Sequence, residues 1–138
     1  MTKARDIMNG GAECVGAQES VLDATRKMKD LGVGALPLCG GDHKLHGMLT
    51  DRDVVVKVLG AGKDPATCPA GDLAQGEVVT MGADDDVEEV LRTMTEHKVR
   101  RLPVIDGHDL VGMVSQADVA RSLPDPKVAE LLQALSTN

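Results

Sequence analysis

The sequence contains no aromatic side chain: of its 138 residues, none is Phe, Tyr or Trp. Its core must therefore be aliphatic, filled by Val, Leu, Ala and the seven Met residues. The absence also removes the rings on which single-stranded nucleic acids usually stack. Because the net charge is −7 and the pI is near 5.0, a polyanionic partner such as a nucleic acid is disfavoured.

Long apolar runs are also missing. No stretch approaches the ~18 apolar residues that a membrane span needs. The first residues, MTKARDIMNGG, lack the apolar centre of a secretory signal. We therefore expect a cytoplasmic protein that does not bind membranes.

Cysteine is scarce, and three residues are too few for a disulfide scaffold. Cys14 and Cys39 fall near strands that a β-α-β crossover would make neighbours, so one interpretation is a disulfide between them. Buried reduced thiols are the alternative in a cytosol. Cys68 lies in a linker rich in Gly, Ala and Pro, where we expect it to be exposed. We expect surface histidines rather than a metal site from the four histidines His43, His46, His97 and His108.

The sequence contains an internal repeat. At an offset of 66 residues, Ala4, Asp6 and Ile7 align with Ala70, Asp72 and Leu73. Later in each copy the offset becomes 65, and GMLTDRD aligns with GMVSQAD. Two copies of such a unit usually pack together, because one alone leaves its apolar face in water.

Each copy predicts the order β-α-β-β-α, so the fold class is α/β. Ser20 and Asp86 precede helical patterns, with an apolar face in the first that includes Val21, Met28 and Leu31. We expect two repeats packed with pseudo-twofold symmetry into one module: residues 1–66 for the first repeat and linker, 67–124 for the second, and a C-terminal helix over 125–138. That helix carries a stripe of Val128, Leu131, Leu132 and Leu135, which packs on its own core or contacts a partner.

Thr50 and Asp53 recur in the second copy as Ser115 and Asp118. A hydroxyl followed three residues later by an acid is close to a capping box, so these residues could simply begin a helix. A binding role is the other interpretation. A strand that ends at a helix N-terminus favours an anion, and a carboxylate can accept hydrogen bonds from two neighbouring ribose hydroxyls. Nothing here pairs a nucleophile with a base.

The stretches GALPL…GMLTDRD and RRLPVIDGHDLVGMVSQAD, with ARDIM and AGDL ahead of them, resemble a pair of CBS domains, also called a Bateman module. The resemblance covers about residues 1–124. Among such pairs the chain is similar to the stand-alone hypoxic-response type of actinobacteria, through GALPLCG, LHGMLTDRD and HKVRRLPVI.

The resemblance implies a sensor that binds an adenosyl ligand (AMP, ADP or ATP, sometimes S-adenosylmethionine) in the cleft between the repeats. It assigns the ribose to Asp53 and Asp118 and hydroxyl contacts to Thr50 and Ser115. The other candidate ligand contacts are the backbone at Leu36 and Leu102, the apolar Ile7 and Leu73, the phosphate-facing Arg52 and Arg101, and Thr80. For Arg101 the alternative is a solvated strand edge without a ligand.

We therefore expect a non-catalytic regulatory module with no required cofactor and no metal, in which the adenine nucleotide is a regulatory ligand. It would act as a homodimer and signal to a protein effector in trans, in a stress or hypoxic response. The alternative is a structural or interaction protein that keeps the fold and has lost the ligand. An enzyme is not expected, because the chain is too short for the catalytic barrel of ~250 residues that larger CBS-containing dehydrogenases carry.

Overall fold

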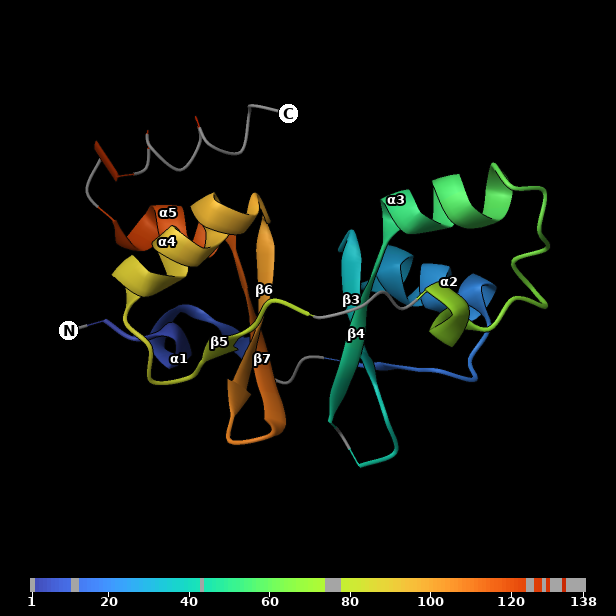
Figure 1. Ribbon diagram of the computed structural model, residues 1–138, viewed down its shortest axis with the longest axis horizontal. Helices are drawn as coiled ribbons and strands as arrows, with labels where there is room; N and C mark the ends of the chain where they lie inside the picture. Colours follow the sequence, from blue (N-terminus) through green and yellow to red (C-terminus); the bar gives the residue numbers. More distant parts are fainter. Residues whose placement is uncertain are drawn as a thin grey trace. The chain divides into compact units, whose positions relative to one another are not determined.

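The computed structural model describes residues 2–10, 13–42, 44–73, 78–123, 126, 127, 129 and 133. The chain divides into two compact units (Figure 1), one formed by Met1–Ala12 with Val79–Asn138 and the other by Glu13–Val78. Most of the C-terminal helix predicted over 125–138, including Val128, Leu131, Leu132 and Leu135, lies outside the described residues, and so does His43. Residues 126, 127, 129 and 133 are helical.

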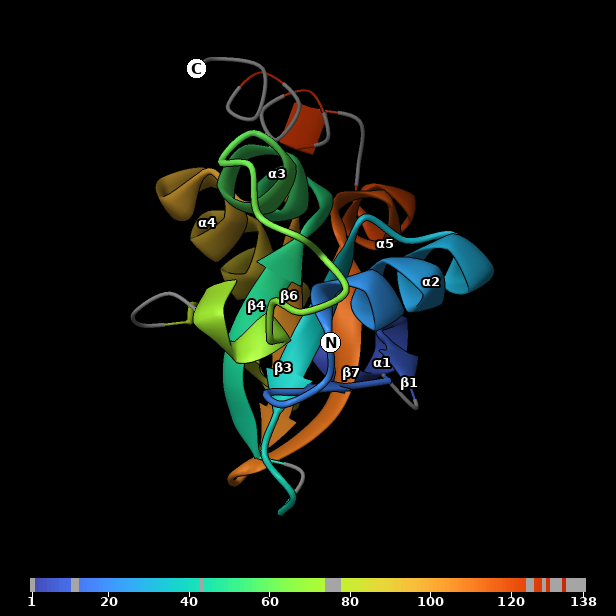
Figure 2. The ribbon, with the colours of Figure 1, turned by 90° about the vertical axis from the view of Figure 1, so that its right-hand side faces the viewer.

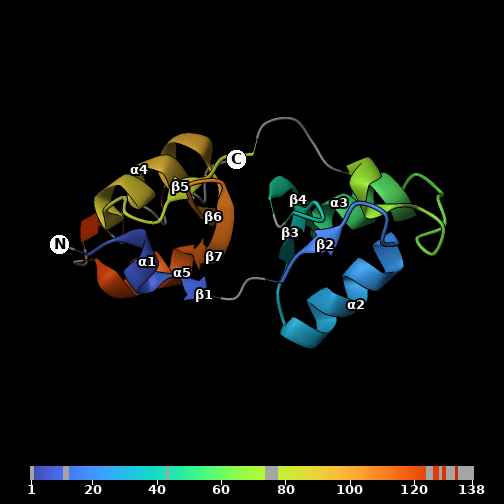
Figure 3. The same ribbon diagram turned by 90° about the horizontal axis from the view of Figure 1, so that it is seen from below.

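The unit Glu13–Val78 has a three-stranded sheet in the order β2-β3-β4. Strand β2 runs parallel to β3, and β3 and β4 form an antiparallel hairpin, which Figure 2 shows lengthwise. Helices α2 and α3 lie on one face of this sheet (Figure 3). The elements are β2 (Val15–Gly16), α2 (Val21–Leu31), β3 (Ala35–Cys39), β4 (Leu45–Thr50), α3 (Asp51–Asp53), the π-helical η1 (Val54–Leu59) and the 3₁₀ turn η2 (Ala70–Leu73).

Helix α2 begins directly after Ser20, as predicted. The Ser20 side chain accepts a hydrogen bond from the Asp23 amide, and Gly32 ends the helix in the left-handed conformation at φ 68°. Val21 and Met28 are buried, but Leu31, predicted on the same face, is 46% exposed. The last turn of α2 therefore presents an apolar side chain outward.

The unit of Met1–Ala12 with Val79–Asn138 has a four-stranded sheet in the order β1-β7-β6-β5. Its hairpin β6–β7 turns at Gly107, whose φ is 67°. Helices α4 and α5 lie on one face of the sheet, with α1 beside α5 (Figure 3). The elements are α1 (Ala4–Ile7), β1 (Asn9–Gly10), β5 (Met81–Gly82), α4 (Val87–His97), β6 (Arg101–Asp106), β7 (Asp109–Ser115) and α5 (Gln116–Ser122). The predicted α/β class with two repeats is confirmed.

Each repeat gives its leading segment (residues 2–10 or 68–73) to the other repeat. The Ala4 amide donates to the Asp85 carbonyl at 2.8 Å, and the Ala70 amide donates to the Glu19 carbonyl at 2.7 Å. The amides that follow do the same: Arg5 donates to Ala83 at 3.0 Å, and Gly71 donates to Ala17 at 2.9 Å. At the offset of 66 residues these bonds are equivalent, so the exchange is reciprocal.

The compact units and the sequence repeats therefore have different boundaries. The prediction of 1–66 and 67–124 follows the repeated pattern, whereas the units follow the contacts that the leading segments make. The expectation that Cys68 is exposed is wrong for the same reason. Its side chain packs in the core of unit Glu13–Val78 at 7% exposure, and its carbonyl accepts a hydrogen bond from the Val21 amide.

A disulfide joins Cys14, the residue before β2, to Cys39 at the end of β3. The sulfurs of Cys14 and Cys39 are 2.02 Å apart and their Cα atoms 5.5 Å apart. The two strands pair there, with Gly16 opposite Cys39. Of the two interpretations that the sequence left open, the structure has the disulfide. In the second repeat the equivalent positions are Thr80 and Ile105, which cannot form this bond.

Candidate functional site

In the first repeat, the sheet register brings the candidate residues to one end of the β3–β4 hairpin. Ala35 lies opposite Thr50 and Leu36 lies opposite Leu49. The Asp51 amide donates to the Gly34 carbonyl at 2.9 Å, which ties the start of β3 to the start of α3. Leu36 and Thr50 are therefore neighbours because the hairpin is in this register.

The second repeat repeats this geometry. Arg101 lies opposite Ser115 and Leu102 lies opposite Val114. The Gln116 amide donates to the Arg100 carbonyl at 2.9 Å. Both repeats thus place a hydroxyl and an acid at the end of the hairpin where its first strand begins.

Both hydroxyl–acid pairs form capping boxes. Thr50 Oγ1 accepts from the Asp53 amide at 3.1 Å, and Asp53 Oδ2 accepts from the Thr50 amide at 3.1 Å. For Ser115 and Asp118 the corresponding distances are 3.3 and 2.8 Å. The helix-starting role considered for these residues is present in both repeats, so a ligand would have to use the remaining acceptor capacity of the acids.

Three residues that the sequence reasoning did not single out contact these acids. Lys57 Nζ lies 3.2 Å from Asp53 Oδ1. Arg121 Nη2 donates to Asp118 Oδ1, and Asn9 Nδ2 donates to Asp118 Oδ2 at 3.3 Å. Lys57 and Arg121 could have been found from their spacings of four and three residues after an acid. No local pattern indicates Asn9, because it comes from the exchanged leading segment.

The short parallel strands leave part of each hairpin edge unpaired. Strand β2 pairs only with Leu38 and Cys39 of β3, and β5 pairs only with Val104 and Ile105 of β6. Along that edge, the backbone at Leu36 and Leu102 has no strand neighbour among the described residues. Such an edge can exchange hydrogen bonds with the polar edge of a flat ligand.

Because the leading segments are exchanged, each of the apolar candidate ligand contacts, Ile7 and Leu73, lies in the unit of the other repeat. Ile7 packs against the core around α4 and α5, in the unit that holds Ser115 and Asp118. Leu73 is 3% exposed in the core of the unit that holds Thr50 and Asp53.

The remaining candidates lie at the surface or close to it. Arg52 at the start of α3 and Arg101 at the start of β6 are exposed. Thr80 is half-buried just ahead of β5. The two arginines are therefore free of core packing, as a contact to a charged ligand group would require.

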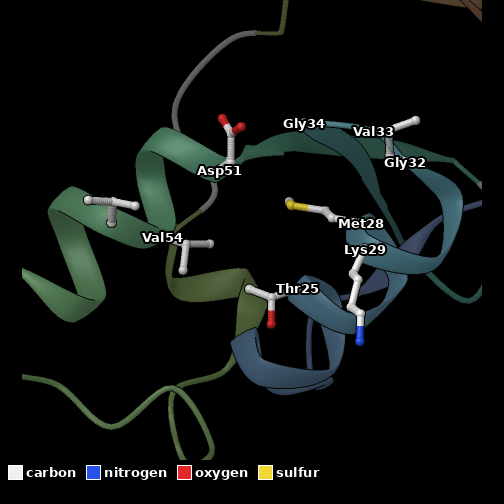
Figure 4. A pocket seen from close by; sticks show the side chains of 9 residues that line it. Thr25, Met28, Lys29, Gly32, Val33, Gly34, Asp51 and Val54 are labelled. Carbon is white, nitrogen blue, oxygen red and sulfur yellow. The ribbon is translucent and has the colours of Figure 1, made fainter.

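A pocket of about 470 Å³ lies between the end of α2 and the start of α3. Figure 4 shows the Met28 side chain pointing toward Asp51 and Val54, while the Lys29 amino group points away from Asp51. The lining residues are Thr25, Met28, Lys29, Gly32, Val33, Gly34, Asp51, Val54 and Val55. Thr50 and Asp53 do not line the pocket, but their chain neighbours Asp51 and Val54 do.

Charged contacts also hold the leading segment of residues 2–10 in place. Arg5 Nε donates to Asp84 Oδ1 at 2.9 Å, and its Nη2 reaches Asp106 at 3.5 Å. The hydrogen bond from Arg5 lowers the pKa of the Asp84 carboxyl below its ordinary value. These groups are exposed, so they orient the segment more than they stabilise it.

Metal and membrane features are absent from the described part of the chain. Among those residues, no three His, Cys, Asp or Glu side chains gather as a metal site would need. None of the helices described there combines the length and apolar character that crossing a bilayer requires.

Comparison with known proteins identifies the family of the chain. The CBS domain family matches residues 4–60 and 70–125. Hypoxic response protein 1 of Mycobacterium tuberculosis is 50% identical over 135 residues, which span 98% of this chain and 94% of that protein. A crystal structure of Hypoxic Response Protein I with two coordinated zinc ions superposes with a TM-score of 0.83 at 53% identity, over 89% of this chain and 100% of that one.

A crystal structure of CBSX2 in complex with AMP shares the fold. Its TM-score is 0.77 at 24% identity, over 88% of this chain and 96% of that one. Both repeats found in the sequence are thus matched by one family, and the architecture agrees with solved members of it. The chain belongs to the CBS domain family, as a tandem pair of its domains.

Proposed function

We propose that this protein is a non-catalytic regulatory module that binds an adenosyl ligand, AMP, ADP or ATP, through its two hydroxyl–acid pairs. The observation that carries the proposal is the duplicated geometry. In each repeat an acid at a helix start follows a β-hairpin in which the backbone at Leu36 or Leu102 has no second strand neighbour among the described residues. A ribose could donate to the acid while an adenine bonds to the backbone at Leu36 or Leu102.

The comparisons support this choice of ligand. AMP is bound in the CBSX2 structure, which shares the fold. Because the chain has no aromatic residue, aliphatic side chains such as the half-buried Ile7 would cover the adenine. Aliphatic contacts give dispersion without stacking, and we expect a modest affinity.

The output of the module would act on another protein. A ligand shifts the equilibrium between two conformations only if it binds one of them more tightly. A partner protein must then bind one of the two conformations preferentially. We propose a homodimer that signals to an effector in trans. The 50% identity to Hypoxic response protein 1 supports a role in the hypoxic or stress response.

Isothermal titration calorimetry with AMP, ADP, ATP and S-adenosylmethionine tests the proposal, and suits a chain without Trp. We expect saturable binding of at least one ligand and its loss in the double variant Asp53→Asn/Asp118→Asn. Asparagine keeps a side-chain oxygen that can accept from the Thr50 or Ser115 amide, while the carboxylate charge is removed. Asp23→Asn, an exposed acid of α2, is the matched control and should bind normally.

Two results would contradict the proposal. One is the absence of heat with all four ligands from protein that melts cooperatively. The other is binding that survives the double variant. Either would favour the interaction-protein alternative, in which the acids serve only as helix caps.

A further inference from the structure

The two acids of the proposed sites differ in how many hydrogen bonds they already accept. Asp118 is 5% exposed. Its Oδ2 accepts from the Ser115 amide at 2.8 Å, from Ser115 Oγ at 3.0 Å and from Asn9 Nδ2 at 3.3 Å, while Oδ1 accepts from Arg121. A carboxylate has about four acceptor positions. Oδ2 of Asp118 is therefore fully occupied by groups of its own chain, and Arg121 already takes one position on Oδ1.

Asp53 is much less occupied. Its Oδ2 accepts from the Thr50 amide at 3.1 Å, and Lys57 Nζ lies 3.2 Å from Oδ1. No other described residue contacts this carboxylate through a hydrogen bond or an ion pair. Its side chain is 20% exposed, against 4% for Asp118. About two acceptor positions of Asp53 remain available, which is the number that a pair of ribose hydroxyls requires.

The difference originates in residues where the repeats diverge. Arg121 stands three positions after Asp118, and the equivalent residue after Asp53 is Val56, which cannot donate. Arg121 forms a charge-assisted hydrogen bond, stronger than one between neutral groups. Its own side chain is nevertheless 71% exposed. It covers the acid from the solvent side without being held by packing, so it can leave without disturbing the core.

We propose that Arg121, helped by Asn9, keeps the second hydroxyl–acid pair closed, so that an adenosyl ligand occupies the first pair, at Asp53, before the second. Arg121 has to leave Asp118 before that acid can accept ribose hydroxyls. The inference rests on the proposed function. It makes Arg121 the residue that sets how many ligands one chain binds.

Titration calorimetry with AMP measures this number directly. We expect one AMP per chain for the unmodified protein, with any second site at least about tenfold weaker, because the ligand must displace a charged hydrogen bond. Arg121→Ala should bind two AMP per chain, and Arg121→Ala/Asp118→Asn should return to one. Arg26→Ala is the matched control: Arg26 is also an exposed arginine paired with an acid three residues away, Asp23, and its removal should leave one AMP per chain.

Asn9→Ala provides a second route, since it removes a donor to Asp118 without touching α5. Like Arg121→Ala, this variant should bind AMP more tightly at the second site. Its circular dichroism should be unchanged. Two equal sites in the unmodified protein, or a single site that Asp53→Asn leaves intact, would overturn the inference while leaving the proposed function standing. The inference would also be overturned if neither Arg121→Ala nor Asn9→Ala bound more AMP per chain than the unmodified protein. A lack of AMP binding by every form would refute the inference for this ligand together with AMP binding itself.

Discussion

At the scale of single residues, carboxylates that fold back onto amides recur in both repeats. Glu19 Oε2 accepts from the Gly16 amide at 2.6 Å, and Asp85 Oδ2 accepts from the Gly82 amide at 2.8 Å. Lys27 Nζ lies 3.1 Å from Glu19 Oε1. These bonds fix the turn that receives the exchanged leading segment, so they contribute to the geometry of the whole repeat.

Glu19 gives a prediction about acid stability. The hydrogen bond from the Gly16 amide, followed by the contact with Lys27, lowers the pKa of the Glu19 carboxyl. A lowered pKa stabilises the fold above the unfolded pKa, and the effect is lost as the pH falls through the folded value. Glu19→Gln should therefore reduce the free energy of unfolding near pH 7 by at most about 1 kcal/mol, since the side chain is 37% exposed.

The measurement is urea unfolding of both proteins from about pH 7 to about pH 3, across the carboxylate range. The difference between them should shrink as the pH falls. Glu96→Gln, at an exposed position of α4, is the control and should show no such trend. A difference that is constant with pH would mean that Glu19 acts through packing instead of charge.

At the scale of elements, the N-terminal caps Ser20 and Asp86 and the apolar spacings predict α2 and α4, because these signals are local. The hairpins are predicted as well, since their turn residues lie within the pattern. The exchange of leading segments cannot be predicted in this way. Ala4 and Ala70 carry the same signals, and bonding to the same repeat or to the other satisfies the local chemistry equally.

The candidate site also has a part that the sequence predicts and a part that only the tertiary structure shows. The strand register and the helix starts place Thr50, Asp53, Ser115 and Asp118 where the repeated pattern predicts them. The contact of Asn9 with Asp118 joins residues 109 apart in sequence, and only the tertiary fold reveals it. The burial of Cys68 was missed for the same reason, because its neighbours come from α2.

The docking of the first leading segment gives a prediction at this scale. A Cβ atom on Gly112 would lie 2.7 Å from the Asn9 carbonyl oxygen and 2.7 Å from Met8 Sδ. The methionine can move, but the carbonyl belongs to strand β1, which pairs with β7 at this residue. Gly112→Ala should therefore destabilise the protein by about 1–3 kcal/mol, as overpacking does.

Gly10→Ala is the control within the same pair of strands. A Cβ atom there meets nothing within 4 Å, so this variant should be close to neutral. Urea unfolding compares the two, and amide hydrogen exchange at Met113 would show whether β1 has been released. Equal stability of the two variants would show that the leading segment does not depend on the close approach at Gly112.

At the scale of the whole molecule, the repeats differ in the apolar surface they present. Leu31, Val55, Val56 and Leu59 are the large hydrophobic residues that remain 46–58% exposed in the described chain, and all four belong to the unit Glu13–Val78. The residues equivalent to the first three are His97, Ala120 and Arg121. Val55 also lines the pocket beside α2. Large exposed apolar side chains confined to one unit make its surface the candidate for an interaction.

The homodimer proposed above could use this surface. Lys29 and Asp51 both line the pocket next to Val55, and a twofold axis through an interface brings a residue of one copy to a different residue of the other. Each Lys29 could then pair with Asp51 of the second copy. The proposed homodimer would thus bury the four hydrophobic side chains and match the charges at their edge.

Light scattering after size exclusion tests the homodimer. We expect a mass of about twice 14.5 kDa for the unmodified protein. Val55→Glu/Val56→Glu should give the mass of one chain, because four carboxylates at a twofold interface would be buried without partners. Ala117→Glu places an acid at an exposed position of α5 and should remain dimeric. A single-chain mass for the unmodified protein, or a dimer that survives both glutamates, would assign the exposed valines to another partner.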